Sequence, residues 1–182
     1  MTELSLHILD IIQNSIVAKA DLISIAICED LATDQLTIEI ADNGKGIDAE
    51  ILKNVADPFY TSRTTRKVGM GLSLFRQAAE QCEGTLTIES KLHSGTKVKV
   101  MMKNSHIDKQ PMGDIAGVVS LMVASNPAID FEYRHQTNRG VYEFNSREIK
   151  QELDEIPISD PKVVKFMREM IQENLNEINT SK

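Results

Sequence analysis

The sequence predicts an α/β (α+β) fold, a two-layer sandwich of helices on a mixed β-sheet, with a small C-terminal α+β extension. Two segments, 2–20 and 72–82, carry apolar residues at helical spacing, which is typical of helices that bury one face. Segments 36–41 and 96–103 alternate apolar and polar residues, which is typical of half-buried strands. A chain of 182 residues is long enough for one domain, or for one domain and an appendage.

Composition narrows the class of protein. Hydrophobic residues make up 41% and charged residues 26%, as in soluble globular proteins, and the net charge of −7 argues against a general nucleic-acid or anionic-membrane surface. The start, 1–4, lacks the basic region of a signal peptide, and the longest nearly apolar run, 115–124, is too short to cross a bilayer. Cys28 and Cys82 match no metal or redox spacing, so we expect buried thiols and a cytoplasmic protein.

The first predicted helix, 2–20, has Thr2 as a candidate N-cap and a polar stripe that includes His7, Asp10 and Asn14. The amide oxygen of Asn14 could bind a hard cation such as Mg²⁺, and Asp10, one turn earlier, could orient or deprotonate a nucleophile. The alternative is that both side chains face solvent, the commoner fate of an isolated polar pair. We expect His7 on the surface or behind the site rather than as a phosphoacceptor.

Two strands, 22–27 and 36–41, follow and lead into a loop that begins at Asp42. The carboxylate of Asp42 could accept a hydrogen bond from an exocyclic amine such as that of adenine. Gly44 and Gly46 would let the backbone approach a flat ring closely. In the alternative interpretation, Asp42 caps a turn and the glycines supply positive φ.

A short helix, 50–55, capped by Asp48, leads into a basic and hydroxyl-rich segment, 57–68. A loop with glycines then opens into the helix 72–82, and such a loop presents unpaired backbone N–H groups to an anion. The basic segment could close over a polyphosphate as a lid; the alternative is a surface loop with solvated charges. The residues concerned are Thr61, Ser62, Arg63, Thr64, Thr65, Arg66, Lys67, Gly69 and Gly71.

The remaining elements are a hairpin and a less readable tail. Strands 85–90 and 96–103 form the hairpin, and the hydroxyl of Thr96 could lie beside the same pocket. In the tail we predict helices at 114–124, 147–153 and 162–178 and a hairpin of 129–134 with 140–144, with Ser146 capping the second helix and Ser159 or Asp160 the third. No chemistry is evident in the tail, which could dock on the first part of the chain, a partner or a second subunit.

Five motifs occur in one order: Asp10-x-x-x-Asn14, Asp42-x-Gly44-x-Gly46, Asp57-Pro58-Phe59-Tyr60-Thr61-Ser62, Gly69-x-Gly71-Leu72 and Ser94-Gly95-Thr96. Together they closely resemble the GHKL superfamily of ATPases, which includes gyrase, the heat-shock chaperone ATPases, histidine kinases and mismatch-repair MutL. The lid sequence looks most like the histidine-kinase branch, whereas the Asn14-Ser15 pair looks more like MutL. The resemblance covers residues 1–104, and 105–182 would be an extension of unknown role.

The resemblance implies a histidine-kinase-type ATPase fold that binds ATP with Mg²⁺. By it Asn14 would hold Mg²⁺, Asp42 would bind the adenine amine, Thr96 would help to bridge the adenine through water, and Phe59 would mark the start of the lid. Asp10 would be the catalytic residue. The implied nucleotide-binding residues are Asn14, Asp42, Gly44, Gly46, Ile47, Phe59, Thr61, Ser62, Gly69, Met70, Gly71, Leu72 and Thr96.

The chain departs from the family pattern at two places. Asp10 stands where hydrolysing members carry a glutamate, and its shorter arm argues for slow or absent hydrolysis. Val17 stands where many kinases carry a cation for the phosphates; Lys19, Arg63, Arg66 or Lys67 could substitute. There is no phosphoacceptor histidine segment and too little chain for a transducer domain.

We therefore expect a protein kinase that acts in trans, on a histidine or serine of a partner protein, in signal transduction. The alternative is a slow ATPase or nucleotide-sensing switch that regulates a partner protein without phosphorylating it. Neither nucleic acid nor membrane is an expected partner, and a homodimer is possible. The sequence does not identify the phosphoacceptor or the partner.

Overall fold

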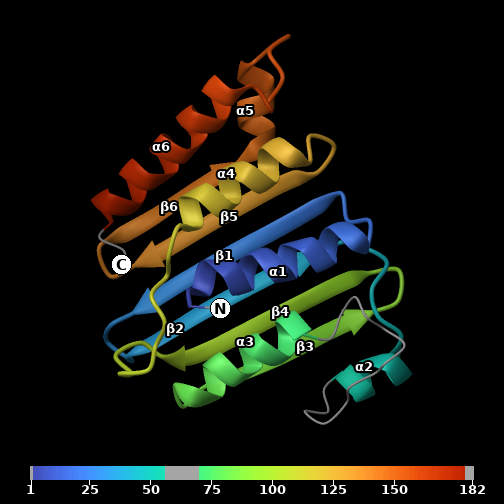
Figure 1. Cartoon of the computed structure of the whole chain (residues 1–182), viewed down its shortest axis with the longest axis vertical. Coiled ribbons are helices and arrows are strands. Elements are labelled where there is room, and N and C mark those ends of the chain that lie inside the picture. Colours follow the sequence, from blue (N-terminus) through green and yellow to red (C-terminus); the bar gives the residue numbers. More distant parts are fainter. Residues whose placement is uncertain (1, 56–69, 179–182) are drawn as a thin grey trace.

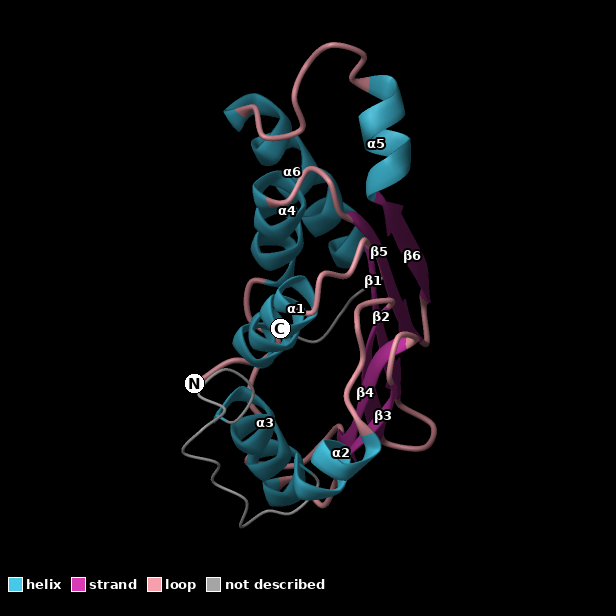
Figure 2. Ribbon diagram, turned by 90° about the vertical axis from the view of Figure 1, so that its right-hand side faces the viewer, coloured by secondary structure: helices cyan, strands magenta, loops and turns pink. Residues whose placement is uncertain are grey.

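The computed structural model describes residues 2–55 and 70–178. In these ranges the chain forms a six-stranded mixed sheet in the order β3-β4-β2-β1-β5-β6, and the long helices lie on one face of it (Figures 1 and 2). This is the two-layer sandwich that the sequence predicts. The strands are β1 (Leu22–Asp30), β2 (Gln35–Asp42), β3 (Thr85–Lys91), β4 (Gly95–Lys103), β5 (Asp130–Thr137) and β6 (Gly140–Asn145). The helices are α1 (Leu4–Val17), α2 (Ala49–Val55), α3 (Met70–Gln81), α4 (Ile115–Ser125), α5 (Ser146–Glu152) and α6 (Pro161–Glu177).

Alternation of side chains along the central strands builds the core. In β1 and β2 every second residue is buried beneath the helices, and the intervening positions are only partly buried. The strands pair antiparallel with Ile25 opposite Ile40, so their isoleucines face the helices together. Because side chains alternate strictly between the two faces, this register fixes which face of the sheet the helices cover.

The C-terminal strands continue the same sheet. β5 pairs in parallel with β1, with Tyr133 opposite Ile25, and β6 then pairs antiparallel with β5 at the edge. The burial of Phe131 and Tyr133 extends the apolar core across this junction. The division of the chain after residue 104 remains a prediction, and one hydrogen-bonded sheet runs through both parts.

The segment between β4 and α4 passes the start of α1. The Leu4 N–H donates to the Pro111 carbonyl at 2.9 Å and the Ser5 N–H to the Met112 carbonyl at 2.8 Å. These carbonyls satisfy N–H groups that a helix start leaves without an intrahelical partner. The prediction of Thr2 as N-cap is wrong: Glu3 holds that position and makes no side-chain cap hydrogen bond.

His7 is buried, which excludes the surface position and leaves the other predicted alternative, a position behind the site. Its ring stacks on Phe75 of α3 with 4.9 Å between ring centroids, and its Nε2 lies 3.0 Å from Gln110 Oε1. The segment that leads to α4 covers this side of α1. Its polar sequence carries no pattern that predicts this contact. Burial lowers the pKa of His7 below its usual value.

Three buried polar side chains connect β1 with β5. His135 Nε2 lies 2.8 Å from Glu29 Oε1, and His135 Nδ1 lies 2.7 Å from the Tyr133 hydroxyl. The exposed fractions of Glu29, His135 and Tyr133 are 4%, 0% and 1%. Burial raises the pKa of the Tyr133 hydroxyl well above its usual value. We call these residues the Glu29–His135–Tyr133 network.

The caps of α2 and α6 are as predicted, and that of α5 is not. Asp48 Oδ1 accepts from the Glu50 N–H at 2.9 Å before α2, and Asp160 Oδ1 accepts from the Lys162 N–H at 2.8 Å before α6. The prediction of Ser146 as a cap is wrong, because Asn145 caps α5 and the Ser146 hydroxyl instead accepts from the Phe131 N–H. None of the helices in the described part of the chain could span a membrane.

Candidate functional site

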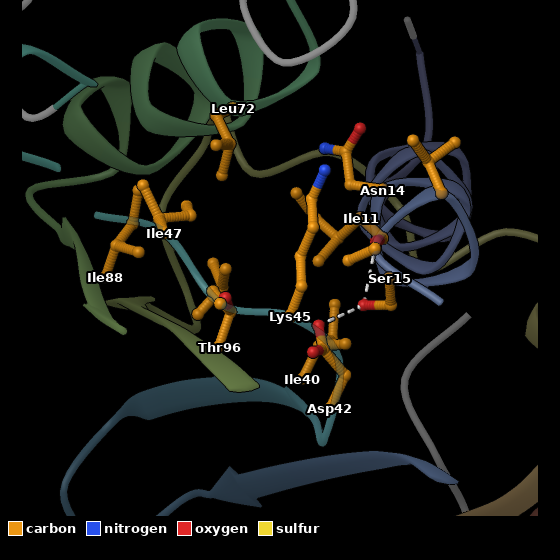
Figure 3. Close-up of a pocket in the computed structure, with 14 residues that line it drawn as sticks. Ile11, Asn14, Ser15, Ile40, Asp42, Lys45, Ile47, Leu72, Ile88 and Thr96 are labelled. Carbon is orange, nitrogen blue, oxygen red and sulfur yellow. Dashed lines mark hydrogen bonds between the residues drawn. The ribbon is translucent and has the colours of Figure 1, made fainter. Parts of the chain in front are cut away.

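A pocket opens between α1, the loop after β2, the strands β3 and β4, and the start of α3 (Figure 3). Its wall is mostly apolar, with one carboxylate, one ammonium, one amide and two hydroxyl groups among the lining side chains. The apolar side chains come from Ile11, Val17, Ala18, Ile40, Ile47, Leu72, Ile88 and Val98, and the polar ones from Asn14, Ser15, Asp42, Lys45 and Thr96. A largely apolar ligand with a few polar groups fits this wall.

Asp42 ends β2, and two donors hold its carboxylate. The buried Ser15 hydroxyl of α1 donates to Oδ2 at 2.6 Å (Figure 3), and the Gly44 N–H donates to Oδ1 at 2.9 Å. Each carboxylate oxygen has two lone pairs, so both oxygens keep acceptor capacity. The arrangement presents an oriented acceptor to the pocket, as recognition of an exocyclic amine requires.

The loop after Asp42 fits between α1 and the β3–β4 turn because of its glycines. A Cβ at Gly44 would lie 2.7 Å from the Ala18 carbonyl oxygen, and a Cβ at Gly46 would collide with the Lys91 carbonyl. The φ angle of Gly46 is +70°, the left-handed conformation that the turn interpretation predicts, whereas Gly44 does not have positive φ. The two interpretations of this loop are therefore compatible, since the same glycines shape the turn and bring backbone to the pocket.

Thr96 joins this loop to the hairpin. Its hydroxyl lies 2.8 Å from the Ser90 hydroxyl, which accepts from the Ile47 N–H at 2.8 Å. Gly95 has φ +101°, and a Cβ there would collide with the Asp42 carbonyl. The turn at Gly95 thus packs directly on the backbone of the residue that presents the carboxylate.

Asn14 and Leu72 bring α1 and α3 to the pocket, but Asp10 does not line it. Asp10 lies against the first turn of α3, where a Cβ at Gly71 would be 3.0 Å from the Asp10 Cβ and 3.1 Å from Oδ2. A glycine at this position lets α3 start beside the carboxylate. Met70 is 79% exposed and does not line the pocket.

The predicted site residues fall into three groups. Asn14, Asp42, Gly46, Ile47, Leu72 and Thr96 line one pocket. Asp10, Gly44, Met70 and Gly71 are neighbours of these residues in the chain or in space and do not line it. Phe59, Thr61, Ser62 and Gly69 lie outside the described residues, as do Arg63, Arg66 and Lys67.

Sequence reasoning missed Ser15, Lys45 and Ser90. A serine in the apolar face of a helix is a weak signal, although it directly follows Asn14. Lys45 stands between two glycines in a polar loop, where a lysine is an ordinary residue. Lys19, one of the predicted substitute cations, is in the left-handed conformation two residues after α1 (φ 58°) and does not line the pocket.

The part of the pocket wall that the structure describes offers too few side-chain ligands to hold a metal ion alone, so a metal here would also bind to oxygens of the bound ligand. Among the described residues no group of three or more His, Cys, Asp or Glu side chains is arranged to hold a metal ion. Among the described residues that line the pocket, Asn14 carries the one side-chain amide. Mg²⁺ commonly takes one or two protein ligands and completes its shell with phosphate oxygens and water, so a single amide oxygen fits such an ion.

Residues 2–106 match the family described as histidine kinase-, DNA gyrase B-, and HSP90-like ATPase. An osmosensing histidine protein kinase of Saccharomyces cerevisiae is 39% identical over 67 residues, which are 34% of this chain and 6% of the yeast protein. An anti-sigma F factor of Clostridium botulinum is 38% identical over 82 residues, which are 44% of this chain and 50% of that protein. The chain therefore covers half or less of the length of these relatives.

One solved structure extends the likeness beyond the matched family region. The N-terminal domain of a DNA repair protein superposes with a TM-score of 0.55 and 20% identity, covering 80% of this chain and 52% of that one. At this identity the likeness shows the fold alone. The coverage is larger than residues 2–106, so part of the C-terminal region shares the arrangement too.

Proposed function

The chain belongs to the histidine kinase-, DNA gyrase B-, and HSP90-like ATPase family, and on that premise we propose that it binds Mg²⁺-ATP and transfers the γ-phosphoryl group to a partner protein. The acceptor is a histidine or serine side chain of the partner. Bond formation from that side chain to the γ-phosphorus accompanies cleavage of the bond to the bridging oxygen, and ADP leaves.

The observation that supports this proposal most is the oriented carboxylate of Asp42 in a mostly apolar pocket. Ser15 and Gly44 fix its two oxygens, and aliphatic side chains that include Ile40 and Ile47 line the same pocket. A purine ring buries its faces against such a wall while its exocyclic amine donates to the carboxylate. The Thr96 hydroxyl adds a polar group at the same end.

The residues for the phosphate end come from α1 and α3. Asn14 would supply one oxygen to Mg²⁺, which when bound neutralises charge on the phosphates. Asp10, one turn earlier on α1 and beside Gly71 of α3, would accept the proton of the attacking side chain. Because an aspartate reaches less far than a glutamate, hydrolysis by water without a partner should be slow.

The alternative function is a nucleotide-dependent switch without phosphoryl transfer. The replacement of glutamate by Asp10 favours it, since a poor base allows nucleotide to stay bound unhydrolysed. The kinase proposal is supported by the lid sequence and by relatives described as histidine protein kinase. Both proposals share the nucleotide site and differ in where the γ-phosphate goes.

Incubation of the protein and a cell extract with γ-labelled ATP tests the function directly. We expect label on a protein of the extract, acid-labile if the acceptor is a histidine and acid-stable if it is a serine. Asn14→Ala is the matched control, because loss of the Mg²⁺ ligand should remove the labelling while leaving some nucleotide affinity. Free labelled phosphate without a labelled protein would support the switch with slow hydrolysis and contradict the kinase.

Ser15→Ala tests how much the second donor on Asp42 contributes. The hydroxyl donates to Asp42 Oδ2 at 2.6 Å, and a hydrogen bond to a charged group contributes about 1.5–3 kcal/mol. We expect ADP affinity to fall by about tenfold or more, as the carboxylate loses its orientation. Isothermal titration with ADP measures it, and Ser120→Ala in α4 is the control, since that hydroxyl bonds only to the backbone of its own helix. Equal affinity of Ser15→Ala and the wild type would contradict the assigned orientation.

A further inference from the structure

The pocket has a polar axis that its two charged side chains define. Asp42 and Lys45 are the only charged residues that the described part of the pocket wall contains. Figure 3 shows Asp42 beside Ser15 at one end, while the Lys45 side chain extends away from Asp42 toward the side where Asn14 lies. A carboxylate at one end and an ammonium toward the other match a ligand with an amine at one end and an anion at the other.

The backbone of Lys45 is held on both sides, so its side chain starts from a fixed point. Its N–H donates to the Ala18 carbonyl at 2.9 Å, and its carbonyl accepts from the His93 N–H at 2.7 Å. The glycines before and after it pack on the backbone of Ala18 and Lys91. Lys45 is itself exposed, and its flexible four-carbon stem extends from this fixed backbone position along the pocket.

Lys45 lacks a carboxylate partner within the described residues. None of the ion pairs or hydrogen bonds found there includes its ammonium group. A lysine that lines a pocket beside an amide and is not paired with an acid is available to an anionic ligand. In contrast, the Lys97 ammonium on the open face of the sheet lies 3.0 Å from Glu39.

Lys45 can supply the cation for the phosphates that the position of Val17 lacks. Val17 lines the same pocket and is 55% exposed, so the C-terminal turn of α1 offers no cation to the phosphates there. From the loop after β2, the Lys45 side chain extends toward the side of the pocket on which Asn14 lies. The ammonium and an Asn14-bound Mg²⁺ would then share the charge of a polyphosphate.

We propose that Lys45 binds the phosphate chain of the nucleotide and thereby sets the preference of this site for phosphorylated over unphosphorylated adenine compounds. The proposal rests on the proposed nucleotide site and adds the residue that reads the anion. The class of ligand is an adenine nucleotide with at least one phosphate. An ammonium group gives point-charge contact to phosphate oxygens, which weakens with added salt.

The test measures the affinities of the wild type and Lys45→Met for adenosine, AMP, ADP and ATP, which differ in the number of phosphates. The methionine side chain is unbranched, one atom shorter than that of lysine, and uncharged. We expect adenosine affinity to change by less than about twofold and ADP affinity to fall about tenfold to a hundredfold, as for a charge-assisted hydrogen bond. Lys45→Arg should recover most of the ADP affinity, and Lys99→Met, the same change on the opposite face of the sheet, should leave all four affinities unchanged.

Two other outcomes overturn the proposal in different ways. Loss of adenosine affinity equal to the loss of ADP affinity would show that Lys45 supports the base end or the loop, and the nucleotide site would stand. Failure of the wild type to bind any of the four compounds would overturn the nucleotide site and the role of Lys45 together. The melting temperature of each variant without ligand, expected within a degree or two of the wild type, shows that the fold is retained.

Discussion

Replacing Asp42 by asparagine is expected to abolish most of the thermal stabilisation that Mg²⁺-ADP gives the wild type. At a hundredfold excess over the dissociation constant, binding contributes about 2.7 kcal/mol, a shift of roughly 5–10 °C for a chain of this length. Both oxygens of Asp42 accept hydrogen bonds, one from Ser15 and one from Gly44. An asparagine has only one accepting oxygen, and its NH2 group is a donor, so it cannot replace the carboxylate at both positions. If affinity falls a hundredfold, about 0.4 kcal/mol remains at the same concentration, a shift of roughly 1–2 °C.

The measurement is a melting scan of wild type and Asp42→Asn, with and without Mg²⁺-ADP. Asp48→Asn is the matched control, because Asp48 caps α2 through one backbone N–H and does not line the pocket. That variant should keep the full ligand-dependent shift while its ligand-free melting temperature falls slightly. An undiminished shift in Asp42→Asn would count heavily against the role assigned to the carboxylate.

Replacing His135 by leucine is expected to cost about 3–5 kcal/mol in the free energy of unfolding. The imidazole is fully buried and contacts Glu29 at 2.8 Å and Tyr133 at 2.7 Å. Removing one member of a buried polar pair leaves the other desolvated without that partner, which is far more costly than removing a surface contact. Chemical denaturation gives the change as a shift of the midpoint at constant slope.

A smaller substitution in the Glu29–His135–Tyr133 network distinguishes the contribution of its hydrogen bonds from that of core packing. Tyr133→Phe removes only the terminal hydroxyl, so we expect it to cost about 1–2 kcal/mol. Nucleotide affinity should stay within about twofold of the wild type in both variants, because the network is remote from the pocket. Asp42 pairs with Ile23 near the start of β1, whereas Glu29 lies near the other end of that strand. A loss below about 1 kcal/mol for His135→Leu would show that the network contributes little.

The sequence predicted most elements because their local signals agree. Alternation along β1 and β2, the Asp-Pro start of α6 and the Asp48 cap of α2 all correspond to observed elements. The errors share one cause, which is contact between distant segments. The carbonyls of Pro111 and Met112 bond to the start of α1 and leave Thr2 no role as a cap, and the same segment buries His7.

The candidate site was predictable where a residue type is unusual for its position. A carboxylate at the end of a strand before two glycines, and an asparagine in an apolar helix, single out Asp42 and Asn14 from the sequence alone. Ser15 and Lys45 were not predictable in this way, because a serine and a lysine are ordinary at such positions. What distinguishes them is direction: the fold turns the Ser15 hydroxyl to Asp42 and the Lys45 stem into the pocket.

The parallel pairing of β5 with β1 has a consequence for how this molecule can be divided. A chain cut after Lys103 would keep the pocket residues but leave the outer backbone groups of Leu22–Cys28, which pair with 130–136 in the intact chain, without hydrogen bonds. An uncovered strand of that length invites edge-to-edge joining of copies. In the intact chain β5 covers this edge, so we expect the shortened chain to self-associate more readily than the intact one.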